Sequence, residues 1–397
     1  MRIRYLLLNA YGQGGTIRTT LSMASVLAER GHDVEVASVL QTAEAPRMPV
    51  SPLVRVVSLT GRRPRPGRRV TPSSTLRWSV KVALRRADTR LGASSDRRAT
   101  VMSRGTDVWV RRWVRAQEDA VVIGTRHSLV LALARSRTDR QVALGQEHNY
   151  MRSDPESRAA YAADYPSLDA LAVLTEQDAA TYRATFGERL PVHVVHNAVP
   201  HGWNPSPSPL TSTTALAAGA LVPRKGFDLL VTAWAGVARE HPDWRLRVLG
   251  SGVQRAELEA AVDAAGLTDV VTFVGFTPDV AAEMAAASMF VLSSRAEGFP
   301  MVVLEAMAAG LPVVAFDCPT GPRELVDDEV TGLLVPRRDT AALAAAVSRV
   351  ASDPDLRRRM GTAAAERARL FDAEAVATRW EQLFAELGDA KGLSLGR

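Results

Sequence analysis

The sequence is poor in residues that cross-link a chain or anchor it in a membrane. It has one cysteine, Cys318, among 397 residues, which excludes an internal disulfide and a cysteine-based metal site. No apolar stretch approaches the roughly 18 residues that a membrane-spanning helix needs. The start of the chain, residues 1–9, is basic and then leucine-rich, but its apolar run is shorter than the core of a signal peptide. We therefore expect a buried first strand and a cytoplasmic protein.

Composition and length favour a folded chain of two domains. Hydrophobic residues make up 46% of the sequence and charged residues 23%, which excludes an intrinsically disordered chain. A length of 397 residues exceeds one ordinary domain and suits two. Only three of the 49 basic residues are lysines, namely Lys81, Lys225 and Lys391. Arginine is the default cation of this chain, so a lysine is the more informative residue.

Positive charge is concentrated in one segment. Between Arg55 and Arg115 the sequence has 17 basic and three acidic residues, whereas the whole chain has a net charge of +6. Apolar residues at helical spacing in this segment are Leu76, Val80, Leu84, Ala87 and Leu91, followed by the pair Trp109 and Trp113. Two ordinary helices with a solvated arginine face would explain the pattern. A surface for anionic lipid or a polyanionic acceptor is the sharper interpretation. Nucleic acid is disfavoured because no nucleic-acid-binding motif accompanies the charge.

Short β-rich runs alternate with helical patterns in both halves of the chain. This alternation predicts α/β domains with doubly wound parallel sheets and helices on both faces. The expected strands are 3–9, 33–39, 54–59, 120–124, 141–145, 170–174 and 192–196 in the first half, and 215–219, 245–249, 270–274, 289–292 and 313–316 in the second.

The domain boundaries follow from a proline-rich stretch. Four prolines in residues 200–209 exclude a helix or a central strand there and indicate a linker. We predict a Rossmann-like domain over 1–203, with a basic insertion at about 61–119. A second Rossmann-like domain would follow over 204–371, and a helix in 372–397 would cross back to the first domain. Ligands of such domains bind at the carboxyl ends of the strands, so we expect two domains that face each other across an interdomain cleft.

A glycine-rich turn follows the first expected strand. Residues 12–16 (Gly-Gln-Gly-Gly-Thr) directly precede an expected helix, whose N-terminal amides and positive dipole end suit an anion or a sugar hydroxyl. The spacing is not that of the Gly-x-Gly-x-x-Gly dinucleotide motif, and no acidic residue ends the second strand. NAD binding is therefore poorly supported, and a strand-to-helix turn that simply needs glycine is the alternative.

A second turn carries a lysine. Residues 219–226 (Gly-Ala-Leu-Val-Pro-Arg-Lys-Gly) follow the first strand of the second domain. A lysine in an arginine-rich chain favours a site that needs a point charge rather than a planar fork, and this describes Lys225. Arg224 beside it adds a second charge. A solvated lysine at a helix start is the alternative.

The most specific motif places two glutamates eight residues apart. Glu297 lies in the loop after an expected strand, and Glu305 lies within the next helix. The amides of Phe299 to Val302, at the start of that helix, suit a pyrophosphate. Such a site attracts anions without a metal, and we find no Asp-x-Asp doublet placed to hold one. Glu305 can then accept from ribose hydroxyls and Glu297 from sugar hydroxyls.

With these motifs the sequence resembles the retaining glycosyltransferases of family 4, which have the GT-B fold. The resemblance implies that 1–203 is the acceptor domain and 204–371 the nucleotide-sugar domain. The resemblance covers nearly the whole chain and is carried by the Gly14-Gly15 turn, residues 223–226, the Glu-x7-Glu element and residues 309–313 (Ala-Gly-Leu-Pro-Val). Residues 146–149 (Gln-Glu-His-Asn) end a first-domain strand where relatives carry a histidine that contacts the donor sugar. Residues 317–324 look like those of relatives that build capsule, teichoic-acid-like or other envelope glycans from UDP-sugars.

The resemblance implies roles for these positions. Lys225 would neutralise the diphosphate leaving group, Glu297 would hold hydroxyls of the transferred sugar, and Glu305 would bind the ribose. His148 would reach the donor sugar or the reacting face, with a structural histidine as the alternative. The expected catalytic residues are His148, Lys225 and Glu297; the expected donor-binding residues are Gly14, Gly15, Arg224, Gly250, Gly252, Phe299, Pro300, Met301, Val302 and Glu305; phosphate or acceptor contacts are expected from Thr16, Arg18 and Arg323.

One position departs from the family pattern. Many relatives have an arginine where this chain has Ala220, and that arginine normally shares the diphosphate with the lysine. Losing one charged donor would cost roughly 2 to 4 kcal/mol of transition-state stabilisation. Arg224 and Arg323 are the residues that we expect to compensate.

The expected activity is retaining, metal-independent transfer of a hexose or N-acetylhexosamine from a UDP-sugar to a hydroxyl of a cell-envelope glycopolymer or polyprenyl-linked precursor. No cofactor is expected. The expected partners are the nucleotide-sugar donor and a polyol-phosphate, glycan or lipid-linked acceptor. Peripheral contact with an anionic membrane at the inner face of the cell is also expected, and nucleic acid is not. Glycosylation of a secreted natural product, a nucleotide-sugar epimerase and a non-catalytic nucleotide-sugar-binding or membrane-scaffold protein are the alternatives.

Overall fold

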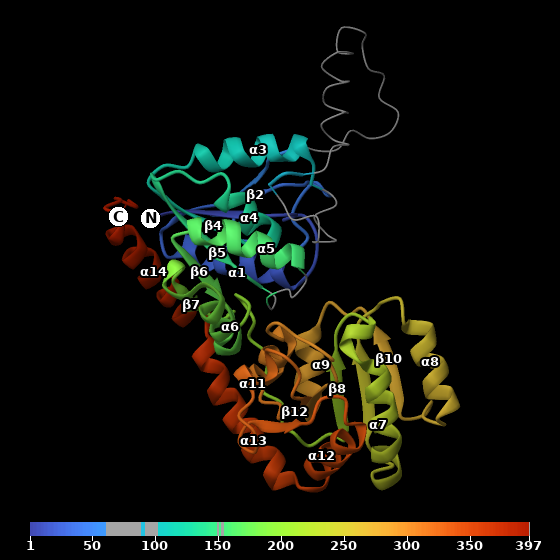
Figure 1. Ribbon diagram of the computed structural model, residues 1–397. Coiled ribbons are helices and arrows are strands. Elements are labelled where there is room, and N and C mark those ends of the chain that lie inside the picture. Colours follow the sequence, from blue (N-terminus) through green and yellow to red (C-terminus); the bar gives the residue numbers. More distant parts are fainter. Residues whose placement is uncertain (61–88, 92–101, 149–150, 152–154, 397) are drawn as a thin grey trace, which may run out of the picture. The chain divides into compact units, whose positions relative to one another are not determined.

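The computed structural model describes residues 1–60, 89–91, 102–148, 151 and 155–396 (Figure 1). The chain divides into two compact units. Unit 1 comprises Met1–His201 together with Ala373–Arg397, and unit 2 comprises Gly202–Asp372. These boundaries lie beside the expected ones at 203–204 and 371–372. Most of the helical stripe expected within residues 76–91 lies outside the described residues.

The described part of unit 1 is built on a parallel sheet of seven strands. In sheet order they are β3 (Arg55–Ser58), β2 (Asp33–Ser38), β1 (Arg2–Leu7), β4 (Ala120–Gly124), β5 (Gln141–Gln146), β6 (Ala170–Val173) and β7 (Val192–Val194). All neighbouring strands run parallel. The strand order reverses direction between β1 and β4, and ligands of such sheets bind beside that point, at the carboxyl ends of the strands.

Helices cover both faces of this sheet (Figure 1). On one face lie α1 (Gly15–Glu29) and α14 (Ala373–Ala390); on the other lie α3 (Arg104–Arg115), α4 (His127–Ala134), α5 (Pro155–Asp164) and α6 (Glu176–Phe186). The C-terminal helix α14 is firmly part of the unit because Trp380 and Phe384 are buried in its core. Arg30, which follows α1, also forms an ion pair of 2.7 Å with Glu381 of α14.

Unit 2 has a parallel sheet of six strands. In sheet order they are β10 (Val271–Gly275), β9 (Arg245–Leu249), β8 (Thr214–Ala218), β11 (Met289–Leu292), β12 (Val313–Phe316) and β13 (Gly332–Val335). Its helices are α7 (Phe227–Glu240), α8 (Arg255–Ala264), α9 (Val280–Ala286), α10 (Met301–Ala308), α11 (Pro322–Leu325), α12 (Thr340–Ser352) and α13 (Pro354–Ala368). Helices α7, α8 and α12 share one hydrophobic core with the sheet, and α10 packs against β11 and β12.

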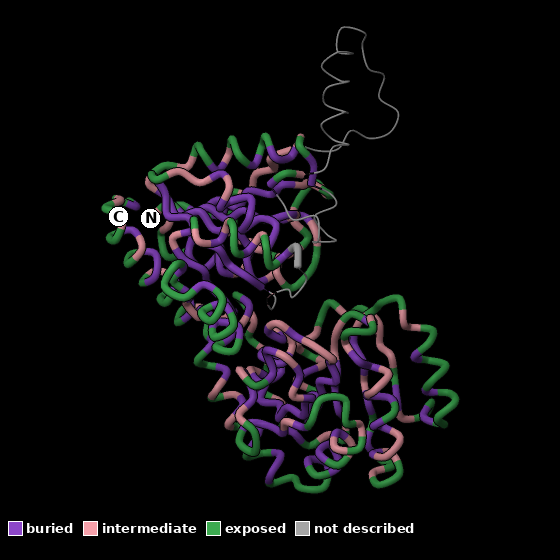
Figure 2. Tube along the Cα trace, in the orientation of Figure 1, coloured by how far each residue is buried: buried purple, intermediate pink, exposed green. Residues whose placement is uncertain are grey.

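The central strands of both sheets are buried on both faces. Val121, Val122 and Ile123 of β4 are fully buried, as are Val313 and Val314 of β12. Figure 2 shows this buried trace inside each unit and exposed residues along the outer helices. Continuous runs of β-branched residues are typical of parallel strands that helices cover on both sides, which explains why apolar runs identify these strands in the sequence.

The expected strands agree with the structure to within two residues at their ends, so this part of the prediction is confirmed. β13 was not expected, because a four-residue strand that begins with glycine gives little signal. It forms by pairing with β12, and Gly332 suits this pairing because a Cβ atom there would lie 2.0 Å from the Val313 carbonyl oxygen. Among the described residues, no helix has the length and apolar character needed to cross a membrane.

Candidate active site

The site residues of unit 2 lie on loops at the carboxyl ends of its strands. β8 leads into a 3₁₀ turn, η5 (Pro223–Lys225), and β11 leads into a loop that contains Glu297 and ends where α10 begins. β8 and β11 are neighbours in the sheet and run parallel. Their loops therefore emerge side by side at the edge where ligands of such sheets bind.

A glycine lets the Lys225 turn approach β11 closely. Gly226 has a φ of 64°, and a Cβ atom there would lie 2.1 Å from the Ser293 carbonyl oxygen. Ser293 Oγ donates to the Lys225 carbonyl oxygen at 3.1 Å. The Arg295 amide donates to the Arg224 carbonyl oxygen at 2.8 Å. Since any other residue at 226 would be strained and would collide with the strand, these backbone contacts fix the position of Lys225.

Glu297 is the centre of a charged hydrogen-bond cluster. Its Oε1 accepts from Lys225 Nζ at 2.6 Å and from Ser294 Oγ at 2.6 Å, and its Oε2 accepts from Arg224 Nη1 at 3.1 Å. Glu297 is 5% exposed, and burial by itself raises the pKa of its carboxyl. The charge and hydrogen bond of Lys225, with smaller contributions from Ser294 and Arg224, outweigh burial and lower that pKa below its usual value. Glu297 is therefore ionised at neutral pH.

The three charged side chains of this cluster carry a net charge of about +1, because two cations share one carboxylate. The Lys225 ammonium has three N–H groups, and one of them donates to Glu297. Its side chain is 15% exposed, whereas that of Arg224 is 51% exposed. A sheltered ammonium beside an accessible guanidinium suits a phosphate ligand, for which charge-assisted hydrogen bonds are strong.

Of the two arginines expected to compensate for Ala220, the structure brings Arg224 to the Lys225 cluster. Arg323 instead pairs with Asp317, and its side chain is 67% exposed. A phosphate contact from Arg323 would require it to leave this carboxylate. Arg224 is therefore the better placed replacement for the missing arginine.

The Glu297 loop is clamped to the loop after β12. The Glu297 amide donates to the Pro319 carbonyl oxygen at 2.8 Å. The Thr320 amide donates to the Glu297 carbonyl oxygen at 2.7 Å. Gly321 has no room for a side chain, because a Cβ atom there would lie 2.5 Å from Pro300 Cδ. These contacts hold the start of α10 next to the charged cluster.

Helix α10 begins at Met301, with Pro300 at its N-cap position. A proline side chain cannot accept a hydrogen bond, so Pro300 does not cap the first amides of the helix, those of Met301 and Val302. Phe299 is buried and anchors the turn. Glu305 lies further along the same helix and is 3% exposed. The helix start is thus suited to an anion, as the sequence predicts.

Two glycines bring the loop after β9 against the loop after β8. A Cβ atom at Gly250 would lie 2.0 Å from the Gly219 carbonyl oxygen, and one at Gly252 would lie 2.3 Å from that of Leu221. The loop that carries Lys225 therefore packs backbone to backbone on its neighbour. Glycine at these two expected donor-binding positions is a steric requirement.

Two large apolar side chains are exposed beside these glycines. Val253 is 88% exposed and Phe276 is 74% exposed. They follow β9 and β10, which are adjacent strands, and the Gly250 amide donates to the Gly275 carbonyl oxygen at 2.7 Å. Exposed aromatic and aliphatic surface at strand ends can stack against a nucleobase.

In unit 1, the glycine turn forms the start of α1. The helix begins at Gly15, with Gly14 at its N-cap position and a φ of 146°. Both glycines are exposed, and a Cβ atom at either would have no described atom within 4 Å. Thr16 and Arg18 lie half-buried in the first turn, and the Arg18 amide donates to the Gly14 carbonyl oxygen at 2.9 Å. The turn leaves space for a ligand at the helix N-terminus.

His148 follows β5 at the carboxyl edge of the unit 1 sheet. His148 as a whole is 7% exposed. Burial, with a smaller contribution from the positive charge of Arg126, lowers the pKa of its imidazole to about 4. The ring is therefore neutral at pH 7, and its Nε2 has no hydrogen-bond partner among the described residues. A neutral imidazole of this kind can donate to or accept from a ligand hydroxyl.

A buried network that the sequence did not predict lies directly beside His148. Tyr165 donates to the Glu147 carboxylate, and the Tyr165 hydroxyl also lies 3.0 Å from His127 Nδ1. Glu147 is 5% exposed, so this hydroxyl compensates for the removal of its charge from water. Tyr161 packs against Tyr165 edge to face, with ring centroids 4.9 Å apart. These contacts hold Glu147, the residue directly before His148, in a fixed position.

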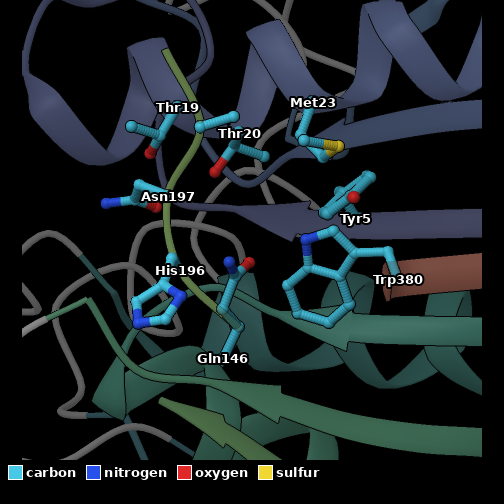
Figure 3. A pocket seen from close by; sticks show the side chains of 9 residues that line it. Tyr5, Thr19, Thr20, Met23, Gln146, His196, Asn197 and Trp380 are labelled. Carbon is cyan, nitrogen blue, oxygen red and sulfur yellow. The ribbon is translucent and has the colours of Figure 1, made fainter. Parts of the chain in front are cut away.

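A small polar cavity in unit 1 lies between α1, the end of β5 and α14 (Figure 3). Its lining residues are Tyr5, Thr19, Thr20, Met23, Gln146, His196, Asn197, Ala198 and Trp380. The cavity volume of about 10 Å³ is enough for one water molecule and too small for a sugar. The Tyr5 hydroxyl, Thr20 Oγ1 and Gln146 Oε1 are buried and have no hydrogen-bond partner among the described residues. A water molecule could satisfy these groups, so we assign the cavity to internal hydration rather than to substrate.

The sequence analysis missed two residues of the site, Ser294 and Glu147, and only the second could have been identified from its sequence context. Ser294 joins the cluster because the loop after β11 turns back within three residues, and a serine in a loop has no distinguishing pattern. Glu147 had a usable signal, since a charged residue directly after a buried strand needs a buried partner. Among the described residues, no group of three or more His, Cys, Asp or Glu side chains is placed to hold a metal ion.

Solved structures share this architecture. A variant of TarM from S. aureus, in complex with fondaparinux, α-GlcNAc-glycerol and UDP, matches with a TM-score of 0.76 at 12% sequence identity, over 97% of this chain and 100% of that one. With its two Rossmann-like units, the chain has the GT-B fold.

Two models of protein families match the chain, and both describe glycosyltransferases. The model described as Glycosyltransferase Family 4 matches residues 13–203, and the model described as Glycosyl transferases group 1 matches residues 204–367. Both units therefore match models of glycosyltransferase families, and the first matches the model of family 4. An exopolysaccharide phosphotransferase of Streptomyces coelicolor is 34% identical over 98% of this chain. The amylovoran biosynthesis glycosyltransferase AmsD of Erwinia amylovora is 27% identical over 55% of it. The chain spans 41% of the first relative's length and 63% of the second's.

Proposed function

We propose that this protein transfers a hexose or N-acetylhexosamine from a UDP-sugar to a hydroxyl group of an envelope glycan or its lipid-linked precursor. The observation that carries the proposal is the cluster of Lys225, Arg224 and Glu297 beside the start of α10. The names of the relatives, which concern exopolysaccharide and amylovoran, support an envelope glycan as the acceptor. The UDP bound to TarM supports a uridine nucleotide.

The charges of the site suit the breaking of the anomeric carbon–oxygen bond. That step leaves negative charge on the diphosphate and positive charge on the sugar ring. Lys225 and Arg224 would donate to the departing phosphate, and the dipole of α10 would add up to about 2 kcal/mol of stabilisation. Since protein groups supply this positive charge, we propose that the transfer needs no metal ion.

We propose that the anomeric configuration is retained. The acceptor oxygen would form its bond to the anomeric carbon on the face that the diphosphate leaves, and its proton would pass to the departing phosphate oxygen. Glu297 is engaged by Lys225, Ser294 and Arg224, which is unfavourable for a covalent nucleophile. The products are the glycoside and a free nucleoside diphosphate, with no proton left over.

The remaining roles proposed for single residues follow the geometry of each unit. Glu305 would accept from the ribose, and Phe276 would stack on the nucleobase at the end of β10. His148, which burial keeps neutral, would form a hydrogen bond with a sugar hydroxyl. A lipid-linked acceptor would require the protein to work at the inner membrane face.

Phosphosugar transfer is a second candidate, because the Streptomyces coelicolor relative is named a phosphotransferase and matches 98% of this chain. The chain spans only 41% of that relative, so the residues responsible for its named activity need not lie in the shared part. The two reactions differ in the bond that breaks. Sugar transfer releases a nucleoside diphosphate, whereas transfer of the sugar phosphate breaks the diphosphate and releases a nucleoside monophosphate.

The test is mass spectrometry of the nucleotide released from a panel of UDP-, GDP- and TDP-sugars, with EDTA present and with glycan or polyprenyl-phosphate acceptors. Release of UDP, together with an acceptor product of retained configuration, is the expected result. Release of UMP would favour phosphosugar transfer, and conversion of the donor sugar without release would indicate an epimerase. Thermal stabilisation by a donor without any turnover would indicate a binding protein.

A further inference from the structure

The outer face of α3 in unit 1 carries four arginines that have no partner among the residues that the structure describes. Arg104, Arg111, Arg112 and Arg115 are exposed, and their guanidinium groups form no hydrogen bond or ion pair with any described residue. Figure 1 shows α3 along the outside of unit 1. In this arginine-rich chain many other guanidinium groups are paired with carboxylates, as Arg135 is with Asp164 at 2.7 Å. The α3 arginines are therefore free to bind an external anion.

The acidic residues near α3 do not neutralise this face. Asp107, within the helix, is buried and accepts from Thr89 Oγ1 at 2.6 Å and from the Arg90 amide at 2.7 Å. Glu118 and Asp119, which follow the helix, lie 3.1 and 3.4 Å from the guanidinium of Arg140. Of the described acidic groups close to this face in the chain, Asp107, Glu118 and Asp119 are thus engaged elsewhere and do not compensate its positive charge.

Apolar side chains are exposed among these arginines. Val108 is 57% exposed and Trp109 is 48% exposed. Trp113, one turn further on, is half-buried instead, and its indole Nε1 donates to Glu35 at 2.7 Å. Val110 and Val114, on the inner face, are fully buried. The periodicity of the helix therefore separates an apolar inner face from an outer face where arginine, tryptophan and valine lie together.

We propose that this outer face of α3 docks on an anionic membrane surface. Guanidinium groups bind phosphates with geometric specificity, and an indole is most stable at the level of the lipid headgroups. The helix has 12 residues and is about 18 Å long, so its outer face presents the four arginines along a line that a flat surface can contact. The exposed Trp109 and Val108 favour a membrane over a soluble polyanion, because only a membrane offers an apolar layer under its charges.

This inference rests on the proposed function in one respect, namely that a lipid-linked acceptor would bring the protein to a membrane. Vesicle binding needs neither donor nor acceptor. A failure to bind vesicles would leave the proposed sugar transfer standing, and a failure of turnover would leave the docking surface standing.

The test is co-sedimentation of the full chain with vesicles of phosphatidylcholine alone and of phosphatidylcholine mixed with phosphatidylglycerol. We expect binding to the anionic vesicles only, and weaker binding as salt rises. Each arginine near an anionic surface contributes about five-fold in affinity. Replacing Arg104, Arg111, Arg112 and Arg115 by Gln should therefore weaken binding by about 600-fold when all four contact the surface, and by about 25-fold when two of them do. Trp109→Ala should weaken it further at high salt, where the apolar contact remains.

Matched controls separate this face from net charge and from general hydrophobicity. A variant with Arg2→Gln, Arg47→Gln, Arg158→Gln and Arg379→Gln removes four exposed arginines elsewhere on unit 1, and Leu53→Ala removes another exposed apolar side chain. If the α3 variants bind within two-fold of these controls, the proposal is wrong. Equal binding to neutral vesicles would also overturn it. Retention on heparin or single-stranded DNA without vesicle binding would identify a soluble polyanion as the occupant instead.

Discussion

Lys225 Nζ lies 2.6 Å from Glu297 Oε1, although 72 positions separate the two residues in the chain. The pair joins the loop after β8 to the loop after β11 and gives both side chains a fixed position. An ammonium is a compact charge whose three donors can point in different directions. Lys225 can therefore hold Glu297 and bind a phosphate at the same time, which gives a physical reason for a lysine in a chain where nearly every other cation is arginine.

Replacing Glu297 by Gln should reduce the free energy of unfolding by roughly 2 kcal/mol. Breaking a fully buried ion pair costs about 3 to 5 kcal/mol, and the Lys225 side chain keeps 15% exposure, which reduces the cost. Urea denaturation at pH 7 measures the change. Glu366→Gln, at an exposed position of α13, is the matched control and should have no measurable effect.

The same variant should change the dependence of stability on pH. The pKa of Glu297 is lowered in the folded chain, so the unfolded chain takes up the proton first as the pH falls. The stabilisation is fully present above the usual glutamate pKa of about 4.3 and is lost below it. Glu297→Gln should therefore flatten the acid side of the stability curve, and an unchanged curve would contradict the ionised assignment.

His148 should make the folded protein less stable as the pH falls from about 6.5 towards 4. The unfolded histidine takes up a proton near pH 6.5, whereas the folded imidazole has a pKa of about 4 because it is buried. One proton of difference gives a slope of about 1.4 kcal/mol per pH unit and roughly 3 kcal/mol in all. Denaturation of the His148→Gln variant over this range should show that slope removed, while the exposed control His201→Gln retains it.

The Tyr165 hydroxyl should contribute measurably to stability. Tyr165→Phe would leave the buried Glu147 carboxylate without that donor, so we expect a loss of about 1 to 3 kcal/mol. Tyr5→Phe is the matched control, because the buried Tyr5 hydroxyl has no protein partner among the described residues and only borders the small hydrated cavity, so its removal leaves no buried charge unpaired. Thermal or urea unfolding of both variants checks the prediction, and an equal loss in the two would contradict the assigned network.

Phe276 should contribute to donor affinity and little to folding. Its side chain is 74% exposed, and stacking of a base on an aromatic ring is worth about 1 to 3 kcal/mol. Phe276→Ala should therefore weaken UDP binding by about five-fold or more in isothermal titration calorimetry. Leu370→Ala removes an apolar side chain of unit 2 with a similar exposure of 68% and should leave the affinity unchanged. Wild-type affinity in the Phe276 variant would remove this residue from the base contact.

The sequence predicted the elements that depend on local pattern. Apolar runs such as residues 120–124 identified the parallel strands, and the linker prolines fixed the stretch near residue 202 where unit 2 begins. The sequence did not predict β13, because this segment becomes a strand by pairing with β12 and not through its own composition. The helical spacing of Trp109 and Trp113 was visible in the sequence. That Trp109 is exposed while Trp113 bonds to Glu35 depends on which side of α3 meets the rest of unit 1.

The candidate site was predictable in its parts and not in its connections. Lys225 and Glu297 could be singled out from motif and composition. Their direct contact required the fold, because the parallel neighbours β8 and β11 bring together loops far apart in sequence. Whether Arg224 or Arg323 would replace the missing arginine was equally undecided, since neighbouring side chains in a turn need not point the same way.

The central claim is that Lys225 stabilises the leaving diphosphate, and the rate of UDP release by a Lys225→Ala variant tests it most directly. We expect kcat to fall by about 10² to 10³, with Arg323→Ala close to wild type. Because Lys225→Ala leaves Glu297 buried without its partner, the double variant Lys225→Ala/Glu297→Gln should recover stability but not activity. Turnover near the wild-type rate in either Lys225 variant would contradict the account.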